Sequence, residues 1–239
     1  MIRRPSVISL PNVRLNFLKK FFREEFLLVA GGRAPSPSWL HSAASERTLF
    51  CIDKGADACR AAKALPSLYV GDDDSASHDA LEWIKNSGIA SKRFPAEKDK
   101  TDTQLALDLL AEKQDAFVVL SGGFGGRFDH AFSLAFAFAG TKLSGCLADE
   151  HEFLLFLRDE DDVALHVSSI PKSVSLLPFS PVCDGVSIDG VHWPLSGATL
   201  RQDNPYAVSN RLSSPDRSIA VKNGRGILGI YLCWDESAL

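Results

Sequence analysis

The sequence predicts an α/β protein in two parts, an N-terminal mostly parallel sheet covered by helices and a smaller C-terminal all-β sandwich. Two observations predict this fold class. Short apolar runs that end in Gly or Asp alternate with helical patterns up to about residue 149, and beyond it short alternating segments replace the helical period. With 239 residues, 45% of them hydrophobic, the chain can bury a substantial core. We expect an α/β domain at residues 26–149 and a β-sandwich domain at residues 150–239.

The first domain is expected to contain buried strands joined by helices. The strands are predicted at residues 26–30, 48–52, 68–70 and 116–120. The helices are predicted at residues 56–64, 77–86, 101–113 and 128–139. This alternation is typical of a Rossmann-like sheet, in which ligands bind beyond the carboxyl ends of the strands. The Gly and Asp residues that end the apolar runs fall at that edge.

Two further segments flank or follow this domain. Residues 1–25 mix apolar and charged side chains, which favours an amphipathic helix that packs on the domain, the alternative being contact with a partner or a membrane surface. In the second domain, strands are predicted at residues 163–168, 174–177, 186–188, 219–221 and 227–233. Turn sequences at 184–185, 189–190 and 223–224 separate several of them.

The composition restricts the partners and the compartment. The 26 basic and 30 acidic residues give a net charge of −4, which offers no electrostatic footprint for nucleic acid or an anionic membrane. No apolar run approaches the ~20 residues that span a bilayer, and no secretion signal is recognisable. The five cysteines are scattered and odd in number, which is typical of reduced, mostly buried thiols. We expect a cytoplasmic protein.

An acidic stretch at residues 71–75 is the first candidate site. Asp72, Asp73 and Asp74 follow a buried strand and Gly71 directly. In an extended segment alternate side chains share a face, so Asp72 and Asp74 are expected to point at one spot and Asp73 away from it. Two such carboxylates repel each other unless a cation lies between them, and their oxygens suit Mg²⁺. The alternative interpretation is a solvated acidic turn.

A second charged stretch, residues 98–104, precedes an apolar helical pattern. Thr101 and Gln104 have the spacing of a capping box, and on that interpretation Asp102 only stabilises the helix dipole. However, Asp99 and Asp102 are interleaved with two lysines. This mixture of charges suits a site that holds both a metal and phosphates.

A glycine-rich turn at residues 121–130 is the third candidate. Its four glycines let the backbone approach a ligand and leave N–H groups free to meet oxyanions at a helix start. Arg127 offers a bidentate fork for phosphate. His130 is either a general base or metal ligand, or a structural histidine. The turn matches neither the Walker pattern nor G-x-G-x-x-G.

Together these stretches resemble the thiamine pyrophosphokinase family. Its motifs G-D-x-D-S, K-D-x-T-D and G-G-R-x-D-H are matched, in order and spacing, at residues 71–75, 98–102 and 125–130. The similarity extends to Gly31 and Gly32, and to residues 53–57, which look like the family's A-D-G-G-A-N. In the second domain the match is looser, at residues 193–195 and 208–210.

The resemblance implies an enzyme that transfers the pyrophosphoryl group of ATP to the thiamine hydroxyl and leaves AMP, with Mg²⁺ as cofactor. It also implies a homodimer with thiamine bound near the subunit interface. By motif position the catalytic residues are Asp72, Asp74, Asp99, Asp102 and Arg127, of which Asp72, Asp74 and Asp102 hold the metal. The nucleotide and its phosphates are expected at Gly31, Gly32, Asp53, Lys98, Thr101, Gln104, Gly125, Gly126, Arg127, Asp129 and His130. Thiamine is expected near Trp193, Ser209 and Asn210.

Some features leave alternatives open. Asp73 stands where the family usually has an apolar or aromatic residue, Lys54 replaces a glycine and Asp57 an asparagine. These departures favour keeping two other functions in view: pyrophosphoryl transfer to another heterocyclic alcohol, such as a pterin, and a non-catalytic module that senses nucleotide or thiamine. Either Asp99 or Asp102 is placed to accept the hydroxyl proton.

Overall fold

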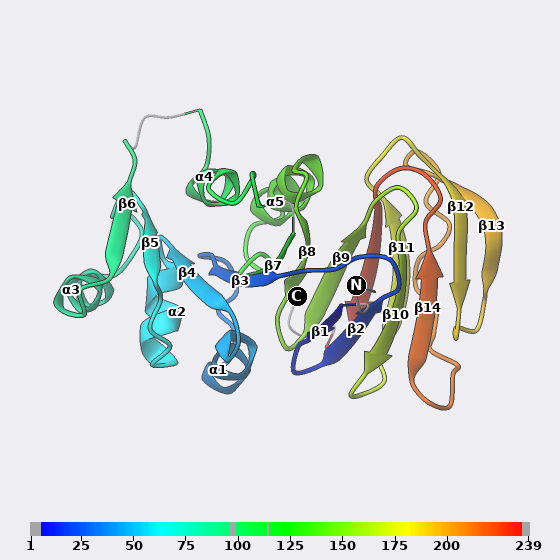
Figure 1. Ribbon diagram of the computed structural model, residues 1–239, viewed down its shortest axis with the longest axis horizontal. Coiled ribbons are helices and arrows are strands. Elements are labelled where there is room, and N and C mark those ends of the chain that lie inside the picture. Colours follow the sequence, from blue (N-terminus) through cyan, green and yellow to red (C-terminus); the bar gives the residue numbers. More distant parts are fainter. Residues whose placement is uncertain (1–5, 96–98, 114, 236–239) are drawn as a thin grey trace. The chain divides into compact units, whose positions relative to one another are not determined.

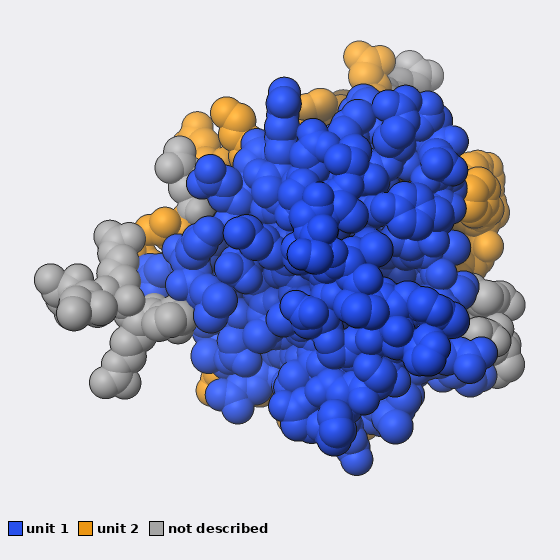
Figure 2. Space-filling view, turned by 90° about the vertical axis from the view of Figure 1, so that its right-hand side faces the viewer, with its two compact units in different colours: residues 1–22, 150–239 blue, residues 23–149 orange. Residues whose placement is uncertain are grey.

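A computed structural model of the chain describes residues 6–95, 99–113 and 115–235. The chain forms two compact units. Residues 23–149 make one of them, here called the α/β unit, and residues 1–22 together with 150–239 make the other, here called the β unit. Figure 2 shows the β unit in blue and the α/β unit in orange. Each unit is described by itself below.

The α/β unit is built on parallel strands in the order β8-β7-β3-β4-β5-β6. Their bounds are β3 (Glu24–Val29), β4 (Thr48–Ile52), β5 (Leu68–Gly71), β6 (Ala90–Arg93), β7 (Ala116–Ser121) and β8 (Ser144–Ala148). Strand β7 is buried at every position, as expected for the interior of a sheet covered on both faces. Strand β6 lies at the edge and is exposed throughout, which explains its polar sequence. The strands predicted at 26–30, 48–52, 68–70 and 116–120 are confirmed.

Helices cover this sheet on both sides. They are α1 (Pro37–Ala44), α2 (Gly55–Ala61), α3 (His78–Asn86), α4 (Asp102–Asp108) and α5 (Phe128–Gly140). Figure 1 shows α1, α2 and α3 on one side of the sheet and α4 and α5 on the other. Ser36, Ser77 and Thr101 cap three of the helices with their side chains, which fixes where these helices begin. The four predicted helices are confirmed, although α2 and α4 end several residues earlier than expected.

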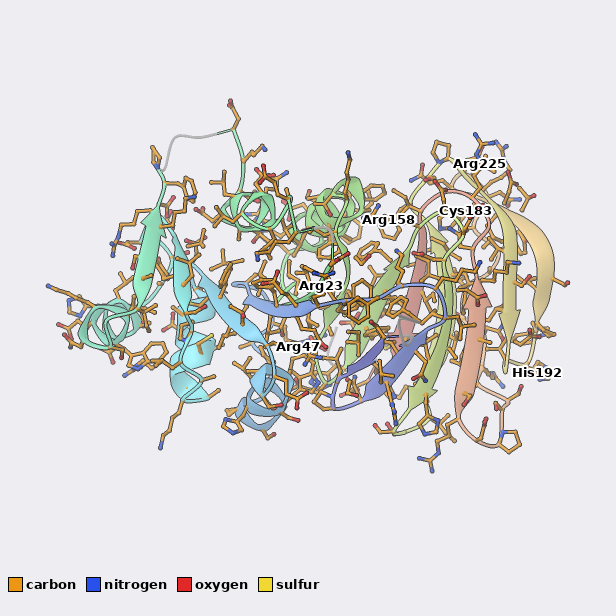
Figure 3. All side chains as sticks on the ribbon, in the orientation of Figure 1. Arg23, Arg47, Arg158, Cys183, His192 and Arg225 are labelled. Atoms are coloured by element: carbon orange, nitrogen blue, oxygen red, sulfur yellow. The ribbon has the colours of Figure 1, made fainter. Side chains whose placement is uncertain are left out.

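One buried ion pair ties the first helix to the sheet. Arg47 Nη2 lies 2.6 Å from Glu25 Oε2 in β3, and Arg47 Nη1 donates to the Ala43 carbonyl at 2.6 Å. Only 4% of the Arg47 side chain is exposed. Figure 3 labels this arginine. Because a buried charge is tolerated only when it is paired, this contact fixes the end of α1 beside the start of β3.

The β unit consists of antiparallel strands. One sheet has the order β1-β2-β10-β14-β12-β13, with β1 (Val7–Ser9), β2 (Val13–Phe17), β10 (Asp162–Val167), β14 (Ser218–Lys222), β12 (Val182–Asp189) and β13 (Leu195–Arg201). A second group pairs in the order β11-β15-β9, with β11 (Ser173–Pro178), β15 (Leu228–Cys233) and β9 (Glu152–Leu157). Inward-facing side chains alternate along β10, where Val163, Leu165 and Val167 are buried.

The helix predicted within residues 1–25 is wrong. The segment forms β1 and β2, and β2 pairs antiparallel with β10 so that Leu15 faces Leu165. The physical reason is a period of two that the mixed composition concealed: Val13, Leu15 and Phe17 are buried, whereas Arg14 is exposed. The N-terminal segment therefore belongs to the β unit and contributes to its core.

Other differences concern short or irregular elements. Helix α1 and strands β6, β8, β9 and β13 were not predicted. Residues 184–185, predicted as a turn, lie inside β12, where the register shifts between Cys183 and Val186. Gly185 has φ of 68°, so this Asp-Gly pair makes a bulge and the strand continues beyond it.

Two compositional expectations can be compared with the structure. All five cysteines are free and buried, as predicted. Within the described ranges, no helix is both long and apolar enough to cross a membrane.

We predict that the N-terminal strand stabilises the β unit. Leu15→Ala should lower the free energy of unfolding by about 2–5 kcal/mol, because it leaves a cavity in a fully buried position. Leu18→Ala is the matched control, since 57% of Leu18 is exposed, and should change it by less than about 0.5 kcal/mol. Urea unfolding measures both variants, and equal small effects would show that residues 6–22 are a dispensable appendage.

Candidate active site

The candidate site lies at the carboxyl ends of the central parallel strands. The register pairs Val29 of β3 with Cys51 of β4 and with Ser121 of β7, and Ile52 of β4 with Val70 of β5. The loops that follow these strands therefore start at one edge of the sheet. They carry the glycines and acidic residues that the sequence singled out, which is where ligands bind in sheets of this kind.

Three carboxylates meet at this edge. Asp53 follows β4, Asp72 follows β5 and Asp102 is the first residue of α4, and oxygen atoms of all three lie within 4.8 Å of one another. Asp53 is held by its backbone, since its N–H donates to the Val70 carbonyl at 2.9 Å. Its φ is 46°, a left-handed conformation that Asp tolerates better than most residues. Backbone geometry thus directs the Asp53 side chain at the neighbouring strand end.

Gly71 makes room for this arrangement. A Cβ atom at Gly71 would lie 2.0 Å from Asp53 Oδ1 and 2.9 Å from the Tyr69 hydroxyl. Both distances are shorter than any real contact, so a side chain there would push the Asp53 carboxylate out of the cluster. The glycine that ends the apolar run is therefore required by a close approach.

Burial and the two neighbouring carboxylates strongly raise the pKa of Asp53. Burial, followed by the negative charges of Asp102 and Asp72, raises the pKa of Asp53 from 3.8 to about 7. Asp53 Oδ1 is buried, and within the described residues it has no hydrogen-bond partner. An orphaned, buried oxygen among like charges fits a cation, and a set of only oxygen donors suits Mg²⁺.

The turn after β5 does not have the predicted geometry. The strand ends at Gly71 and the chain bends, so the expected alternation of Asp72 and Asp74 about an extended segment is wrong. Asp74 is exposed and outside the group of three, and its N–H donates to Asp72 Oδ1 at 3.3 Å. Sequence reasoning placed Asp53 at the nucleotide, although its position after the neighbouring strand could have placed it beside Asp72.

The second charged stretch is confirmed as a helix start. Thr101 Oγ1 accepts from the Gln104 N–H at 3.2 Å, and Gln104 Oε1 accepts from the Thr101 N–H at 2.9 Å, which completes the capping box. This cap orients the first turn that carries Asp102. Asp99 is exposed and is not one of the three clustered carboxylates. Lys98 lies outside the described residues.

Glycines allow two loops to pack backbone against backbone. The Gly32 N–H donates to the Gly122 carbonyl at 2.9 Å, and the Ala30 N–H donates to the Ser121 carbonyl at 2.8 Å. Gly122 has φ of 72°, and a Cβ there would lie 2.2 Å from the Ala30 carbonyl oxygen. The predicted phosphate loop after β7 is thus joined to the predicted Gly31–Gly32 turn after β3.

A further anchor of these loops was missed. Arg33 Nε and Nη2 donate to Asp149 Oδ2 at 2.9 and 2.7 Å, and the Asp149 side chain is fully buried. The Arg33 guanidinium also lies 6.0 Å from the centre of the Phe124 ring. The only sequence signal was an arginine next to the glycine pair, because its partner lies far along the chain.

The end of the glycine-rich loop presents an exposed arginine. Arg127 Nε and Nη2 donate to the two carboxylate oxygens of Asp129 at 3.1 and 2.5 Å, and the His130 N–H donates to Asp129 Oδ1 at 3.0 Å. The hydrogen bonds from Arg127 hold the pKa of Asp129 below its usual range. Gly125 and Gly126, with φ of 70° and 69°, shape the turn before it. Arg127 therefore stands, oriented and solvent-exposed, at the start of α5.

A separate pocket of about 120 Å³ lies in the β unit. Its lining is uncharged: Val174, Leu176, Ile188, Trp193, Leu195, Tyr206, Ala207, Val208 and Asn210. Asn210 fixes the Trp193 backbone, because Nδ2 donates to its carbonyl at 2.7 Å and Oδ1 accepts from its N–H at 3.1 Å. Ser209, in a left-handed conformation with φ of 58°, donates its N–H to Ser175 Oγ at 3.0 Å.

The tryptophan of this pocket also contacts the residue that precedes it in the chain. The His192 ring packs edge-on against Trp193, with ring centres 4.5 Å apart. Figure 3 shows His192 at the opposite end of the β unit from Arg225. Trp193 and Asn210, predicted near the substrate, thus line one pocket, and Tyr206 is a lining aromatic residue that sequence reasoning missed.

Both units match models of one protein family. Residues 40–143 match the thiamin pyrophosphokinase catalytic domain, and residues 162–228 match the thiamin pyrophosphokinase vitamin B1 binding domain. Together the two matches span most of the chain. The protein belongs to the thiamine pyrophosphokinase family. The first match contains the carboxylate cluster, and the second contains the pocket.

Individual relatives agree with this family. The chain is 29% identical over 190 residues to the thiamine pyrophosphokinase of Bacillus subtilis strain 168, a match that covers 77% of this chain and 88% of the relative. The fold is similar to the crystal structure of thiamine pyrophosphokinase from Bacillus subtilis, with a TM-score of 0.76, 23% identity and coverage of 89% and 100% of the two chains. It is also similar to thiamin pyrophosphokinase from Candida albicans, with a TM-score of 0.68, 16% identity and 97% of each chain covered.

We predict that Asp53 makes the metal-free protein less stable as the pH rises. Because the pKa of Asp53 is about 7 in the folded state and has its ordinary value of 3.8 in the unfolded chain, the folded state binds more protons between these pH values. In EDTA, the free energy of unfolding should therefore fall from pH 5 to pH 8, and less so in Asp53→Asn. Urea unfolding at several pH values measures this, with Asp115→Asn as a control at the other end of the sheet. Parallel curves for wild type and Asp53→Asn would contradict the perturbed carboxyl.

Proposed function

We propose that this protein is a thiamine pyrophosphokinase, which transfers the pyrophosphoryl group of ATP to the thiamine hydroxyl to give thiamine diphosphate and AMP. The observation that carries the proposal is the pair of family matches, because the catalytic-domain match contains the acidic cluster and the B1-binding match contains an aromatic pocket. With it we propose the finer fold description, a Rossmann-like catalytic domain and a sandwich domain that holds the vitamin.

Asp53, Asp72 and Asp102 are the residues that would hold Mg²⁺. Support comes from their mutual approach within 4.8 Å and from the orphaned Asp53 Oδ1. When bound, Mg²⁺ would neutralise charge on the pyrophosphate oxygens during transfer. This set replaces Asp74, which the resemblance suggested, by Asp53. In the absence of the ion the three charges would repel one another.

The chain's own residues would position the nucleotide and stabilise the charge that develops. The loops after β3 and β7, joined through Gly32 and Gly122, expose backbone to the edge of the sheet where phosphates would lie. Arg127 offers a guanidinium fork to the oxygens of the transferred group. One of the two carboxylates Asp99 and Asp102 would accept the proton of the attacking hydroxyl.

The pocket of the β unit is the proposed thiamine site. Its uncharged lining offers aromatic faces, Trp193 and Tyr206, to a ring system that carries a positive thiazolium. Asn210 holds the tryptophan in place through two hydrogen bonds. We further propose that the protein is a cytoplasmic homodimer and that the thiamine site lies at the subunit interface, as the family resemblance implies.

The two other functions are not favoured. Transfer to a pterin would not account for a match to a vitamin B1 binding domain over residues 162–228. A non-catalytic sensor would not require three closely spaced carboxylates, which are costly to hold together unless a cation acts there.

We predict that the products identify the reaction. With ATP, Mg²⁺ and thiamine, AMP and thiamine diphosphate should form in equal amounts, because attack on the β-phosphorus releases AMP and adds two phosphates to the acceptor. Chromatography of the reaction mixture measures both products. Thiamine monophosphate is the control acceptor, since its hydroxyl is blocked and no AMP should accumulate. Formation of ADP with thiamine monophosphate from thiamine would contradict the proposal.

We also predict that Asp72 and Asp74 differ, although they are only two positions apart. Asp72→Asn should lower kcat by about 100-fold or more, because it removes a charge from the proposed metal site. Asp74→Asn should cost less than about tenfold, because Asp74 lies outside the cluster. Steady-state kinetics at several Mg²⁺ concentrations measures both variants. An equal loss in the two would restore Asp74 as a ligand.

A further inference from the structure

Asp73, the middle of the three consecutive carboxylates at residues 72–74, forms an ion pair with the edge strand β6. Its Oδ2 accepts from Arg93 Nε at 2.7 Å. Arg93 is the last residue of β6 and pairs in register with Gly71, the last residue of β5. The ion pair thus connects the turn that carries Asp72 to the strand beside it, and Asp73 is not among the three clustered carboxylates.

Asp73 also sets the direction of the chain in this turn. It has φ of 70°, a left-handed conformation that L-residues rarely adopt and that Asp and Asn tolerate best. Immediately after it, the Asp74 N–H donates to Asp72 Oδ1. The orientation of the Asp72 carboxylate therefore depends on a bend whose central residue is Asp73.

The Asp73 carboxylate is confined from a second side. The Tyr69 side chain in β5 is fully buried, and Asp73 Oδ1 is buried as well. Burial, followed by the charge of Asp73, raises the pKa of Tyr69. One oxygen of the Asp73 carboxylate is thus held by Arg93 and the other is buried, which leaves the side chain little freedom to rotate toward the cluster.

We infer that Asp73 is a positioning residue: its hydrogen bond from Arg93, together with its left-handed backbone, holds the turn that directs Asp72 toward Asp53 and Asp102. The inference rests on the proposed function, because it concerns the metal site of that reaction. It assigns different roles to consecutive carboxylates, with Asp72 acting on the cation and Asp73 on the shape of the turn.

Positioning and simple electrostatics predict opposite results at Arg93. If Arg93 acted only through its charge, Arg93→Met would remove a positive group near the site and strengthen the binding of a cation. If Arg93 holds the turn, the same variant lets Asp72 move, and cation binding weakens. Asp73→Asn also distinguishes positioning from electrostatics. If only charge matters, cation binding weakens, because a negative charge near the site is lost. If Asp73 holds the turn, binding changes little, because Asn keeps an oxygen that accepts from Arg93 and tolerates positive φ.

The test is binding of Mn²⁺ to the full-length protein without nucleotide, measured from the EPR signal of the free ion. Arg93→Met should weaken Mn²⁺ binding about tenfold, by the scale of residues that orient metal ligands, and Asp73→Asn should change it by less than about threefold. Lys113→Met, which breaks the exposed Lys113–Glu24 pair at the opposite end of the strands, is the matched control and should leave it unchanged. Circular dichroism verifies that each variant is folded.

Binding that is unchanged or tighter in Arg93→Met, or tenfold weaker in Asp73→Asn, overturns the positioning role. An Asp72→Asn variant distinguishes this from failure of the proposed function. If Asp72→Asn loses Mn²⁺ while Arg93→Met retains it, only the positioning role is overturned. If Asp72→Asn also binds Mn²⁺ as tightly as wild type, the metal site fails and the inference fails with it.

Discussion

The repulsion among Asp53, Asp72 and Asp102 is the constraint on which the α/β unit depends. Two unit charges 4 Å apart interact by about 4 kcal/mol at an effective dielectric constant of about 20, so bringing three carboxylates together opposes folding by several such contributions. Burial, followed by this repulsion, raises the pKa of Asp53 to about 7, so its carboxyl retains a proton nearly to neutrality. A fold keeps such a group only where the surrounding backbone leaves the side chains no other position.

Parallel pairing of the strands holds the three carboxylates close together in spite of their repulsion. Strands β4 and β5 are neighbours, so the residues that follow them start from one edge whatever their side chains prefer. The capped first turn of α4 brings the third carboxylate to the same place. The core beneath is formed by buried strands such as β7, and its apolar burial offsets the electrostatic cost above it. This arrangement also requires glycine at position 71, because a methyl group there would collide with Asp53.

The sequence was informative where one physical signal dominates. Apolar runs and their Gly or Asp ends located the central strands, and the Thr101–Gln104 spacing located a helix start, because both signals are local. The sequence-based predictions were wrong or incomplete where the surrounding structure, rather than a local pattern, determines the conformation. The pairing of β2 with β10 was missed because the partner strand is far along the chain. Asp74 was placed beside Asp72 because alternation was extended past Gly71, where the strand has already ended. The contact of Arg33 with Asp149 could not be predicted, since neither residue belongs to a motif.

The way β1 and β2 join the β unit has a consequence for biosynthesis. During translation the contiguous residues 23–149, which contain the parallel strands β3 to β8, emerge before residues 150–239 of the β unit. Strand β2, by contrast, leaves the ribosome early and must wait for its partner β10, which begins only at Asp162. Throughout that interval β2 has β1 beside it but lacks β10 on its other edge, and exposed strand edges of this kind make nascent chains prone to aggregation or chaperone binding. The free edge of β2 is therefore covered only after β10, in the second half of the chain, has been made.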